Sequence, residues 1–273
     1  MRRILLTVVL AAATLTGLGA PRAAAATCSL DPVGGVQPRT FAGRTYFIHV
    51  PAGLPNPAPL VLALHGAGQG GRLHADDTRW HDFADGHKFI VAYPDGTGSP
   101  PTWGFDHNSN DVRFLRQLVA EISSKYCVDA RRVYATGHSN GAIMALRLAC
   151  DAADVFAAVA EYAGAHPTFT GSPCTPSRPI SVGVFAGTFD FLSLLPFGIW
   201  TRDQWVKLNH CPTKPAREAG VLLEATRYAP CAGGQEVVWR AYLTQSHNWP
   251  RAADWNDIKQ RMWDLFMRHP MPV

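Results

Sequence analysis

The segment Gly137-His138-Ser139-Asn140-Gly141 constrains the fold of this chain more than any other short stretch. An apolar run typical of a strand precedes it at 132–136, and a run rich in Ala, Leu and Met, typical of a helix, follows at 142–150. In this context a G-x-S-x-G serine lies on a tight turn that projects its hydroxyl from the sheet. The glycines leave room for a strained backbone, and the helix N-terminus favours developing negative charge. The context therefore favours a nucleophile at Ser139 over an ordinary glycine-rich turn.

Short apolar runs alternate with helix-like segments along the rest of the chain. We expect strands at 45–50, 60–64, 89–93, 132–136, 180–185 and 237–243, and helices at 112–126, 142–150, 202–209 and 252–268. The run 155–162 fits either a helix or a strand, and Asp111 is a candidate cap for the helix at 112–126. This alternation predicts an α/β protein with a mostly parallel central sheet and helices on both faces. Because no repeat or linker interrupts it, residues 27–273 are predicted to form a single domain.

The first 26 residues have the features of a cleavable export signal. Arg2 and Arg3 precede an apolar run at 4–18, and an Ala-rich stretch ends the segment. The apolar run is short for a membrane anchor, which needs roughly 20 apolar residues. We therefore expect cleavage after Ala26 and a secreted protein, although the double arginine matches a twin-arginine export motif only in part.

Charge and cysteine content narrow the classes of partner and cofactor. The formal charge of the whole chain is +4, but after loss of the signal 22 basic residues face 21 acidic ones. This balance argues against nucleic acid, which usually requires a clustered basic face. No later segment is apolar enough to span a membrane, and we expect a soluble monomer.

An even number of cysteines in an exported chain predicts disulfides, with many pairings open. The six are Cys28, Cys127, Cys150, Cys174, Cys211 and Cys231. Because no C-x-x-C spacing or histidine cluster accompanies them, we expect no metal site and no cofactor.

A nucleophilic serine needs a base, and the base needs an acid to orient it. In a sheet of this type the acid follows the serine along the chain, and the histidine follows the acid. His247 lies in the loop after the strand at 237–243, where a base would reach the edge of the sheet that carries Ser139. The other later histidines lie before the next strong strand, at a helix end and in the C-terminal tail: His166, His210 and His269.

Asp190 is the predicted acid. It follows the strand at 180–185 and therefore lies at the carboxyl end of a strand, where catalytic groups gather in open α/β sheets. Asp203 is the alternative, although an acid in the first turn of a helix is favourable in any case. Asp151 and Asp154 are expected to be solvated residues that follow a helix.

Two further features concern the oxyanion and the substrate. Ester hydrolysis needs hydrogen-bond donors for the oxyanion. The glycine-rich stretch 64–68 follows the strand at 60–64, so we predict the backbone amides of Ala67 and Asn140 as these donors; a flexible loop is the alternative, and no Gly-Lys-Ser/Thr ends it as in a phosphate loop. Trp103 and Trp249 lie in nearby loops, where they would either stack on a substrate or pack inside the protein.

In their order and spacing, these segments resemble the polyhydroxybutyrate-depolymerase-like esterases, which include feruloyl and acetylxylan esterases of carbohydrate esterase family 1. The resemblance runs from about Arg44 to Pro250 and rests on Leu64-His65-Gly66, Tyr93-Pro94-Asp95-Gly96, Tyr126-Cys127-Val128-Asp129, the segment 132–141, Gly187-Thr188-Phe189-Asp190 and His247-Asn248-Trp249-Pro250. It implies an α/β-hydrolase fold and a triad of Ser139, Asp190 and His247. It also implies three disulfide pairs, Cys28 with Cys127, Cys150 with Cys174 and Cys211 with Cys231.

The chain departs from the family pattern around the expected substrate entrance. Ala186 replaces the usual histidine before Gly-Thr-x-Asp, and Gln245 and Ser246 replace glycines before His247. The stretch after Asp190 is unusually apolar, which favours acyl chains or aromatic acids.

The predicted function is that of a secreted serine carboxylesterase working through an acyl-enzyme. The resemblance implies small-molecule or polysaccharide-linked esters as substrates, either feruloyl and acetyl esters of plant polysaccharides or hydroxyalkanoate esters. Two alternatives are a serine peptidase on the same fold and a non-catalytic binding protein with a relic site. The complete order of serine, acid and histidine argues against the relic site.

Overall fold

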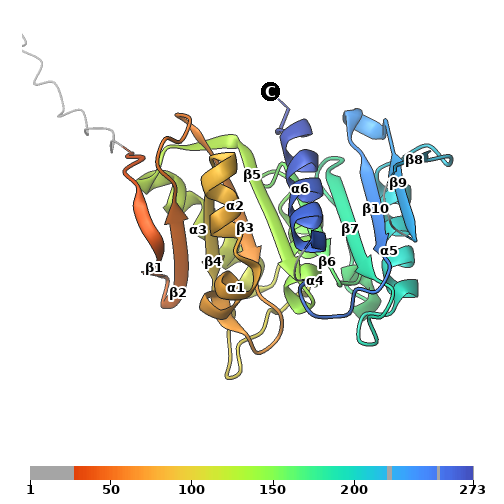
Figure 1. Ribbon diagram of the computed structural model, residues 1–273, viewed down its shortest axis with the longest axis horizontal. Coiled ribbons are helices and arrows are strands. Elements are labelled where there is room, and N and C mark those ends of the chain that lie inside the picture. Colours follow the sequence, from red (N-terminus) through yellow and green to blue (C-terminus); the bar gives the residue numbers. More distant parts are fainter. Residues whose placement is uncertain (1–27, 220–222, 251–252, 273) are drawn as a thin grey trace, which may run out of the picture.

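The computed structural model describes residues 28–219, 223–250 and 253–272, so the expected export signal lies outside the described residues. One ten-stranded sheet crosses the molecule in the order β1-β2-β4-β3-β5-β6-β7-β10-β9-β8 (Figure 1). Its strands are β1 (Val33–Phe41), β2 (Arg44–Val50), β3 (Ala58–Leu64), β4 (Ile90–Pro94), β5 (Val128–His138), β6 (Ala158–Tyr162), β7 (Ser181–Gly187), β8 (Ala216–Arg217), β9 (Glu224–Tyr228) and β10 (Val237–Tyr242).

The six central strands, from β4 to β10, pair in parallel, whereas β1, β2, β9 and β8 add antiparallel edges. The run 155–162, which the sequence left open, contains the strand β6. Every residue of β3, β4, β6 and β7 is buried, as expected for strands that are covered on both faces.

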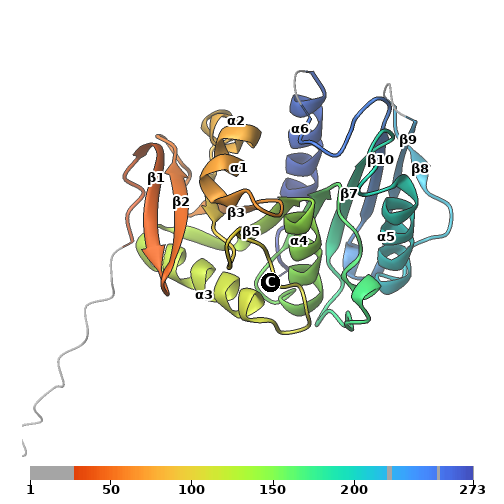
Figure 2. The same ribbon diagram turned by 90° about the horizontal axis from the view of Figure 1, so that it is seen from below.

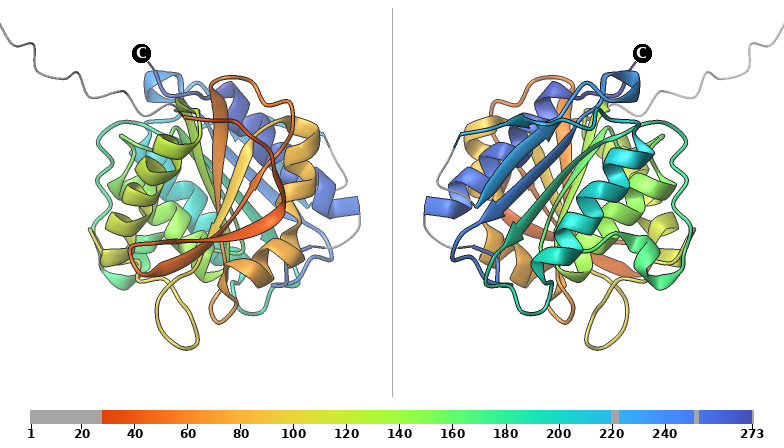
Figure 3. Two further views of the ribbon diagram at one scale, coloured as in Figure 1. Left: turned by 90° about the vertical axis from the view of Figure 1, so that its left-hand side faces the viewer. Right: turned by 90° about the vertical axis from the view of Figure 1, so that its right-hand side faces the viewer.

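Helices cover both faces of the sheet, which confirms the predicted α/β-hydrolase architecture. Figure 2 shows α1, α2 and α6 on one side and α3, α4 and α5 on the other, and Figure 3 shows the same two layers from each edge of the twisted sheet. The helices are α1 (Gly70–Thr78), α2 (Trp80–His87), α3 (Asn110–Lys125), α4 (Asn140–Asp151), α5 (Leu195–Leu208) and α6 (Ala253–Arg268), with short 3-10 turns η1 (Pro167–Thr170) and η2 (Ala232–Gly234).

Successive side chains of a strand point to opposite faces of the sheet, so the core consists of two layers. In β3, Leu60, Leu62 and Leu64 belong to the cluster on the α3–α4–α5 side. Val61 and Ala63 belong to the cluster on the α1–α2–α6 side. Among the described residues, no helix is both long and apolar enough to cross a bilayer.

Two expectations about helix ends were wrong. Ser109 caps α3, because its Oγ accepts the Val112 amide at 3.2 Å. Asp111, the predicted cap, lies in the first turn, where it is buried, pairs with Arg44 and accepts the Gly104 amide at 2.7 Å. The helix expected at 202–209 begins at Leu195, because the apolar stretch after Asp190 turns into α5.

The predicted elements did not include β1, α1, α2, β8 and β9. The residues of β1 are mostly exposed, since it is an edge strand, and α1 has only four buried residues. Such segments lack the strong apolar periodicity from which an element is predicted.

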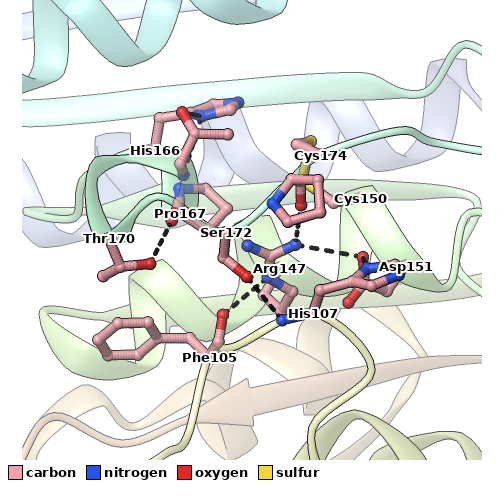
Figure 4. Close-up of a disulfide and its surroundings, with 12 residues drawn as sticks. Phe105, His107, Arg147, Cys150, Asp151, His166, Pro167, Thr170, Ser172 and Cys174 are labelled. Atoms are coloured by element: carbon pink, nitrogen blue, oxygen red, sulfur yellow. Dashed lines mark hydrogen bonds and ion pairs between the residues drawn. A yellow bond between two sulfur atoms is a disulfide. The ribbon is translucent and has the colours of Figure 1, made fainter.

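Three disulfides join the cysteines in the pairs that the resemblance implied: Cys28–Cys127, Cys150–Cys174 and Cys211–Cys231. Figure 4 shows the second pair, which lies beside the fully buried Arg147. Arg147 donates to the carbonyl oxygens of Phe105 at 2.8 Å and Pro173 at 2.6 Å and pairs with Asp151. The Arg147 side chain thereby joins the loop that contains Phe105 to the loop that contains Pro173. His166 lies near both sulfurs, but sulfurs bonded to each other are not thiolate ligands for a metal.

Candidate active site

Ser139 lies on the turn between β5 and α4, which we call the nucleophile elbow (Gly137–Gly141). Its backbone has φ 55° and ψ −119°, a combination that is strained for a residue with a side chain. The strain is held by the surrounding backbone, because the Ser139 amide donates to the Tyr162 carbonyl at 3.1 Å and its carbonyl accepts the Ile143 amide at 3.1 Å. The sharp turn leaves the serine half-buried at the end of the strand.

Both glycines of the elbow are required by close backbone contacts. A Cβ atom at Gly137 would lie 2.2 Å from the Gly141 carbonyl oxygen. A Cβ atom at Gly141 would lie 2.2 Å from the carbonyl oxygen of Leu64, at the end of β3. The elbow therefore packs directly on the loop that follows β3, and only glycine fits at these two positions.

Hydrogen bonds connect Ser139 to His247 and His247 to Asp190. The Ser139 hydroxyl lies 2.8 Å from His247 Nε2. On the other side of the ring, His247 Nδ1 lies 2.9 Å and 3.0 Å from the two carboxylate oxygens of Asp190. These three residues are at least 51 positions apart in the sequence. The structure brings them together at the carboxyl ends of β5, β7 and β10.

The Asp190 carboxylate is buried and is held by the chain around it. Its Oδ1 accepts the amides of Leu192 at 2.9 Å and Ser193 at 2.7 Å. The loops after β7 and β10 are joined as well, because the Phe189 amide donates to the Gln245 carbonyl at 2.9 Å. A Cβ atom at Gly187 would lie 2.2 Å from that same carbonyl oxygen. Asp190 and His247 therefore come from loops with a fixed separation.

Two side chains that the sequence analysis did not identify hold the loop of His247. His138 Nε2 donates to the carbonyl oxygen of His247 at 2.5 Å. The Tyr162 hydroxyl donates to the carbonyl oxygen of Ser246 at 2.6 Å. His138 is the variable residue before the serine in G-x-S-x-G, and Tyr162 ends β6, so neither position stands out in the sequence.

Burial changes the protonation of two groups around the triad. Loss of solvent lowers the pKa of His138 to about 4, so the ring is neutral at pH 7 and Nε2 carries its proton toward the His247 carbonyl. Burial raises the pKa of Glu161 to about 8, and the nearby Asp190 adds to this shift. Glu161 accepts the Gly164 amide at 2.7 Å. A protonated Glu161 leaves Asp190 as the local negative charge opposite His247.

The two predicted oxyanion donors lie beside the serine. Within the described residues, the amides of Ala67 and Asn140 make no hydrogen bond, while the neighbouring Gly66 and Gly68 amides are both paired. A Cβ atom at Gly66 would lie only 3.5 Å from the Cβ atom of Ser139, so this loop borders the hydroxyl. Asn140 also begins α4, whose N-terminus favours an anion.

Trp103 and Trp249 are 2% and 7% exposed, which favours the packing alternative over an open stacking surface. The Trp103 indole donates to the His65 carbonyl at 3.0 Å, and its amide donates to Asn140 Oδ1 at 2.8 Å. Trp103 thus joins the loop after β3 to the elbow. Trp249 packs against Tyr162 and His138 behind the triad.

The remaining candidates lie outside this arrangement. Asp203 is in the middle of α5 and pairs with Arg202. His166 is buried with Nδ1 2.8 Å from Thr168 Oγ1, while His269 pairs with Glu236 and His210 is exposed.

Comparisons with known proteins find esterases. The profile of the family described as Esterase PHB depolymerase matches residues 44–172. A bifunctional acetylxylan esterase/xylanase from Neocallimastix patriciarum is 29% identical over 237 residues, which are 82% of this chain and 33% of the relative. A putative esterase from Nocardia uniformis subsp. tsuyamanensis is 37% identical over 197 residues, 67% of this chain and 56% of the relative. The chain spans about a third of the length of the first of these curated relatives.

The solved structure of an acetyl xylan esterase from Aspergillus awamori has the same fold. It aligns with a TM-score of 0.69 at 19% identity and covers 86% of this chain and 99% of its own. The fold and the order of serine, aspartate and histidine define the chain as an α/β-hydrolase. Within that class, residues 44–172 match the PHB depolymerase esterase family, and the chain is similar to feruloyl esterases.

Proposed function

We propose that this protein is a serine carboxylesterase that hydrolyses its substrate through an acyl-enzyme. The single observation that carries the proposal is the hydrogen-bonded series from Asp190 through His247 to the strained Ser139. Activation of a serine requires an imidazole base with the serine hydroxyl on one side of the ring and a carboxylate on the other. Membership of an esterase family supports ester bonds over amide bonds.

In the first half of the reaction, His247 Nε2 takes the proton from Ser139 as Oγ attacks the ester carbonyl carbon. Asp190 keeps the Nδ1 proton of His247 in place and stabilises the imidazolium. The Ala67 and Asn140 amides donate to the carbonyl oxygen as it becomes negative. The bond to the alcohol then breaks, and His247 gives its proton to the departing oxygen.

In the second half, water replaces the alcohol. His247 takes a proton from the water, whose oxygen attacks the acyl carbon, and the same amides hold the second oxyanion. The bond to Ser139 Oγ breaks, the serine regains its proton from His247, and the acid is released.

The names of the relatives guide the choice of ester. They include acetylxylan esterases, feruloyl esterases and a poly(3-hydroxyalkanoate) depolymerase. Acetyl or feruloyl esters of plant polysaccharide and hydroxyalkanoate esters are therefore the first substrates to examine. We further propose export by cleavage after Ala26, supported by the pattern of residues 1–26 and by three disulfides, which persist in oxidising compartments. The mature chain, 27–273, is proposed to act as a single-domain monomer.

The test compares the mature protein with its Ser139→Ala variant on p-nitrophenyl acetate and butyrate. We expect the variant to lose about 10⁴-fold or more in kcat, since a triad without its nucleophile retains only oxyanion and binding effects. Trapping of the acyl-enzyme by rapid quench and mass spectrometry should add the acyl mass to the peptide that contains Ser139.

Hydrolysis that persists in Ser139→Ala would overturn the mechanism. If neither ester is hydrolysed while a peptide substrate is cleaved in a serine-dependent way, the peptidase alternative replaces the esterase. A far-ultraviolet circular dichroism spectrum and a melting temperature that match the wild type show that the variant is folded.

A further inference from the structure

A pocket of about 310 Å³ opens beside the triad and carries an inference about the acyl group. Ser139 and His247 both line it, so an acyl chain bound there can be continuous with the carbon that the serine attacks. The rest of its wall is mainly apolar and includes Ile143, Ala165, Phe169, Leu192 and Phe197. These side chains come from α4, from η1 and its approach, and from the rim, as we call residues 191–197.

The polar groups in this wall are already used inside the protein. The Ser193 hydroxyl donates to the Gly164 carbonyl at 2.8 Å. The Gly164 amide donates to Glu161, and the Leu192 and Ser193 amides donate to Asp190. Apart from Ser139 and His247, no lining side chain among the described residues is charged, and the one other lining hydroxyl, that of Ser193, already donates its proton inside the protein.

The mouth of the pocket exposes large apolar side chains to water. Leu192 is 77% exposed, Phe169 48% and Phe197 44%. Contact with an apolar ligand would remove this surface from water, which is favourable in proportion to the area buried. A hydroxyl group carried into the same space would lose its water, and outside the triad only the Ser193 oxygen could accept from it among the lining side chains.

From this wall we infer that the pocket binds an unsubstituted acyl chain, aliphatic or phenylalkyl, of about four to nine carbon atoms. The volume has room for about ten groups of the size of a water molecule, so an acetyl group leaves most of it unfilled. The inference rests on the proposed function and deepens it. It favours longer unsubstituted acyl groups over acetyl groups and over aromatic acids with a ring hydroxyl.

The first experiment measures kcat/KM of the mature protein on p-nitrophenyl acetate, butyrate and octanoate. Each methylene that enters the pocket should raise kcat/KM by roughly fourfold until the space is filled. A second pair isolates the hydroxyl: p-nitrophenyl 3-phenylpropionate should exceed its 4-hydroxyphenyl analogue by about tenfold or more.

Variants then assign the preference to this wall. Leu192→Ser and Phe197→Ser, both at exposed positions, should each lower the octanoate-to-acetate ratio of kcat/KM by about threefold or more. Leu73→Ser is the matched control, because Leu73 is a 48% exposed leucine on α1 outside the pocket, and it should leave the ratio unchanged.

The outcomes separate this inference from the proposed function. A serine-dependent activity that is highest on acetate, or that prefers the hydroxylated aromatic ester, would overturn the inference and leave the esterase intact. An unchanged ratio in both rim variants would do the same. Loss of all serine-dependent ester hydrolysis would instead overturn the proposed function, and the inference with it.

Discussion

The nucleophile elbow and the rim border the same serine, yet they are built in opposite ways. In the elbow, Gly137 and Gly141 contact backbone so closely that one added carbon would lie 2.2 Å from a carbonyl oxygen. In the rim, Phe191 and Leu192 are 80% and 77% exposed. The two glycines of the elbow therefore leave no space for a larger side chain. The exposed side chains of the rim, in contrast, have few contacts inside the protein that a substitution would break.

This difference separates catalysis from selectivity. Groups that activate the serine lie where strand ends meet and where backbone hydrogen bonds fix the chain, as at Asp190 and His247. The rim side chains that line the acyl pocket, Leu192 and Phe197, are exposed, so their replacement should not disturb the fold. Changes in the first region should therefore have large effects on rate or folding, and changes in the rim should alter mainly the choice of substrate.

The largest effect should come from Asp190→Asn. An amide in place of the carboxylate cannot hold the Nδ1 proton of His247 and favours the wrong tautomer, so kcat should fall by about 10⁴-fold. The buried group accepts two amides through Oδ1, and an asparagine oxygen can accept the same pair, so the fold should persist. Steady-state kinetics and a thermal melt measure the two effects. Activity within tenfold of the wild type would show that another acid orients His247.

Next in size is the effect of Gly141→Ala. The new Cβ would meet the carbonyl oxygens of Leu64 and His65, so the elbow and the end of β3 must move apart. We expect about 1–3 kcal/mol of destabilisation, typical of overpacking, together with a loss of activity as the oxyanion donors separate. Urea unfolding and kcat measure both.

Gly86→Ala is the matched control for that substitution. Gly86 lies in α2, and a Cβ atom there would meet nothing within 4 Å. Alanine should therefore stabilise the protein by about 0.4–1 kcal/mol through the unfolded state. Equal effects of the two changes would contradict the tight contact at the elbow.

The contrast between the two regions also explains what the sequence could predict. The elbow has a sequence signature because backbone contacts permit only glycine at Gly137 and Gly141, and the ends of the buried strands then fix where Asp190 and His247 must lie. The three disulfide pairs were available from the family resemblance alone, because spacing leaves many pairings open.

The residues that support the triad could not be found in this way. His138 and Tyr162 act through contacts between segments that are far apart in the chain, and Glu161 is affected by burial and by Asp190 after another strand. Each of the three is unremarkable in its local sequence. Similarly, Ser109 rather than Asp111 caps α3, because Asp111 is drawn into a buried pair with Arg44. Tertiary contacts decided each of these cases.

Glu161→Gln should produce a pH-dependent effect close to the triad. The pKa of Glu161 is raised from 4.5 to about 8 in the folded protein, so between these values the folded chain keeps a proton that the unfolded chain loses. This group therefore contributes stability that is full below pH 4.5 and is lost as the pH rises through 8, at up to about 1.4 kcal/mol per pH unit. Glutamine does not titrate, so this part of the pH dependence should disappear.

Urea unfolding of the wild type and Glu161→Gln at pH 5, 6.5 and 8 measures the change. The variant should lose less stability than the wild type between pH 5 and 8. Glu121→Gln is a suitable control, since it removes a carboxylate from a surface pair with Lys125 on α3. A variant with the same pH dependence as the wild type would show that Glu161 is ionised throughout this range.

The smallest effect should come from Phe191→Ser in the rim. Phe191 is 80% exposed and does not line the 310 Å³ pocket, so its loss should change the free energy of unfolding by less than about 0.5 kcal/mol. Its neighbour Leu192 contacts the pocket, whereas Phe191 faces water, so the octanoate-to-acetate ratio should also stay near that of the wild type. Measuring Phe191→Ser and Leu192→Ser together therefore shows whether the octanoate preference comes from the pocket wall or from the apolar character of the whole rim. A similar loss of octanoate preference in both variants would mean that the whole rim gathers apolar substrate, while a loss in Leu192→Ser alone would place the selectivity in the pocket wall.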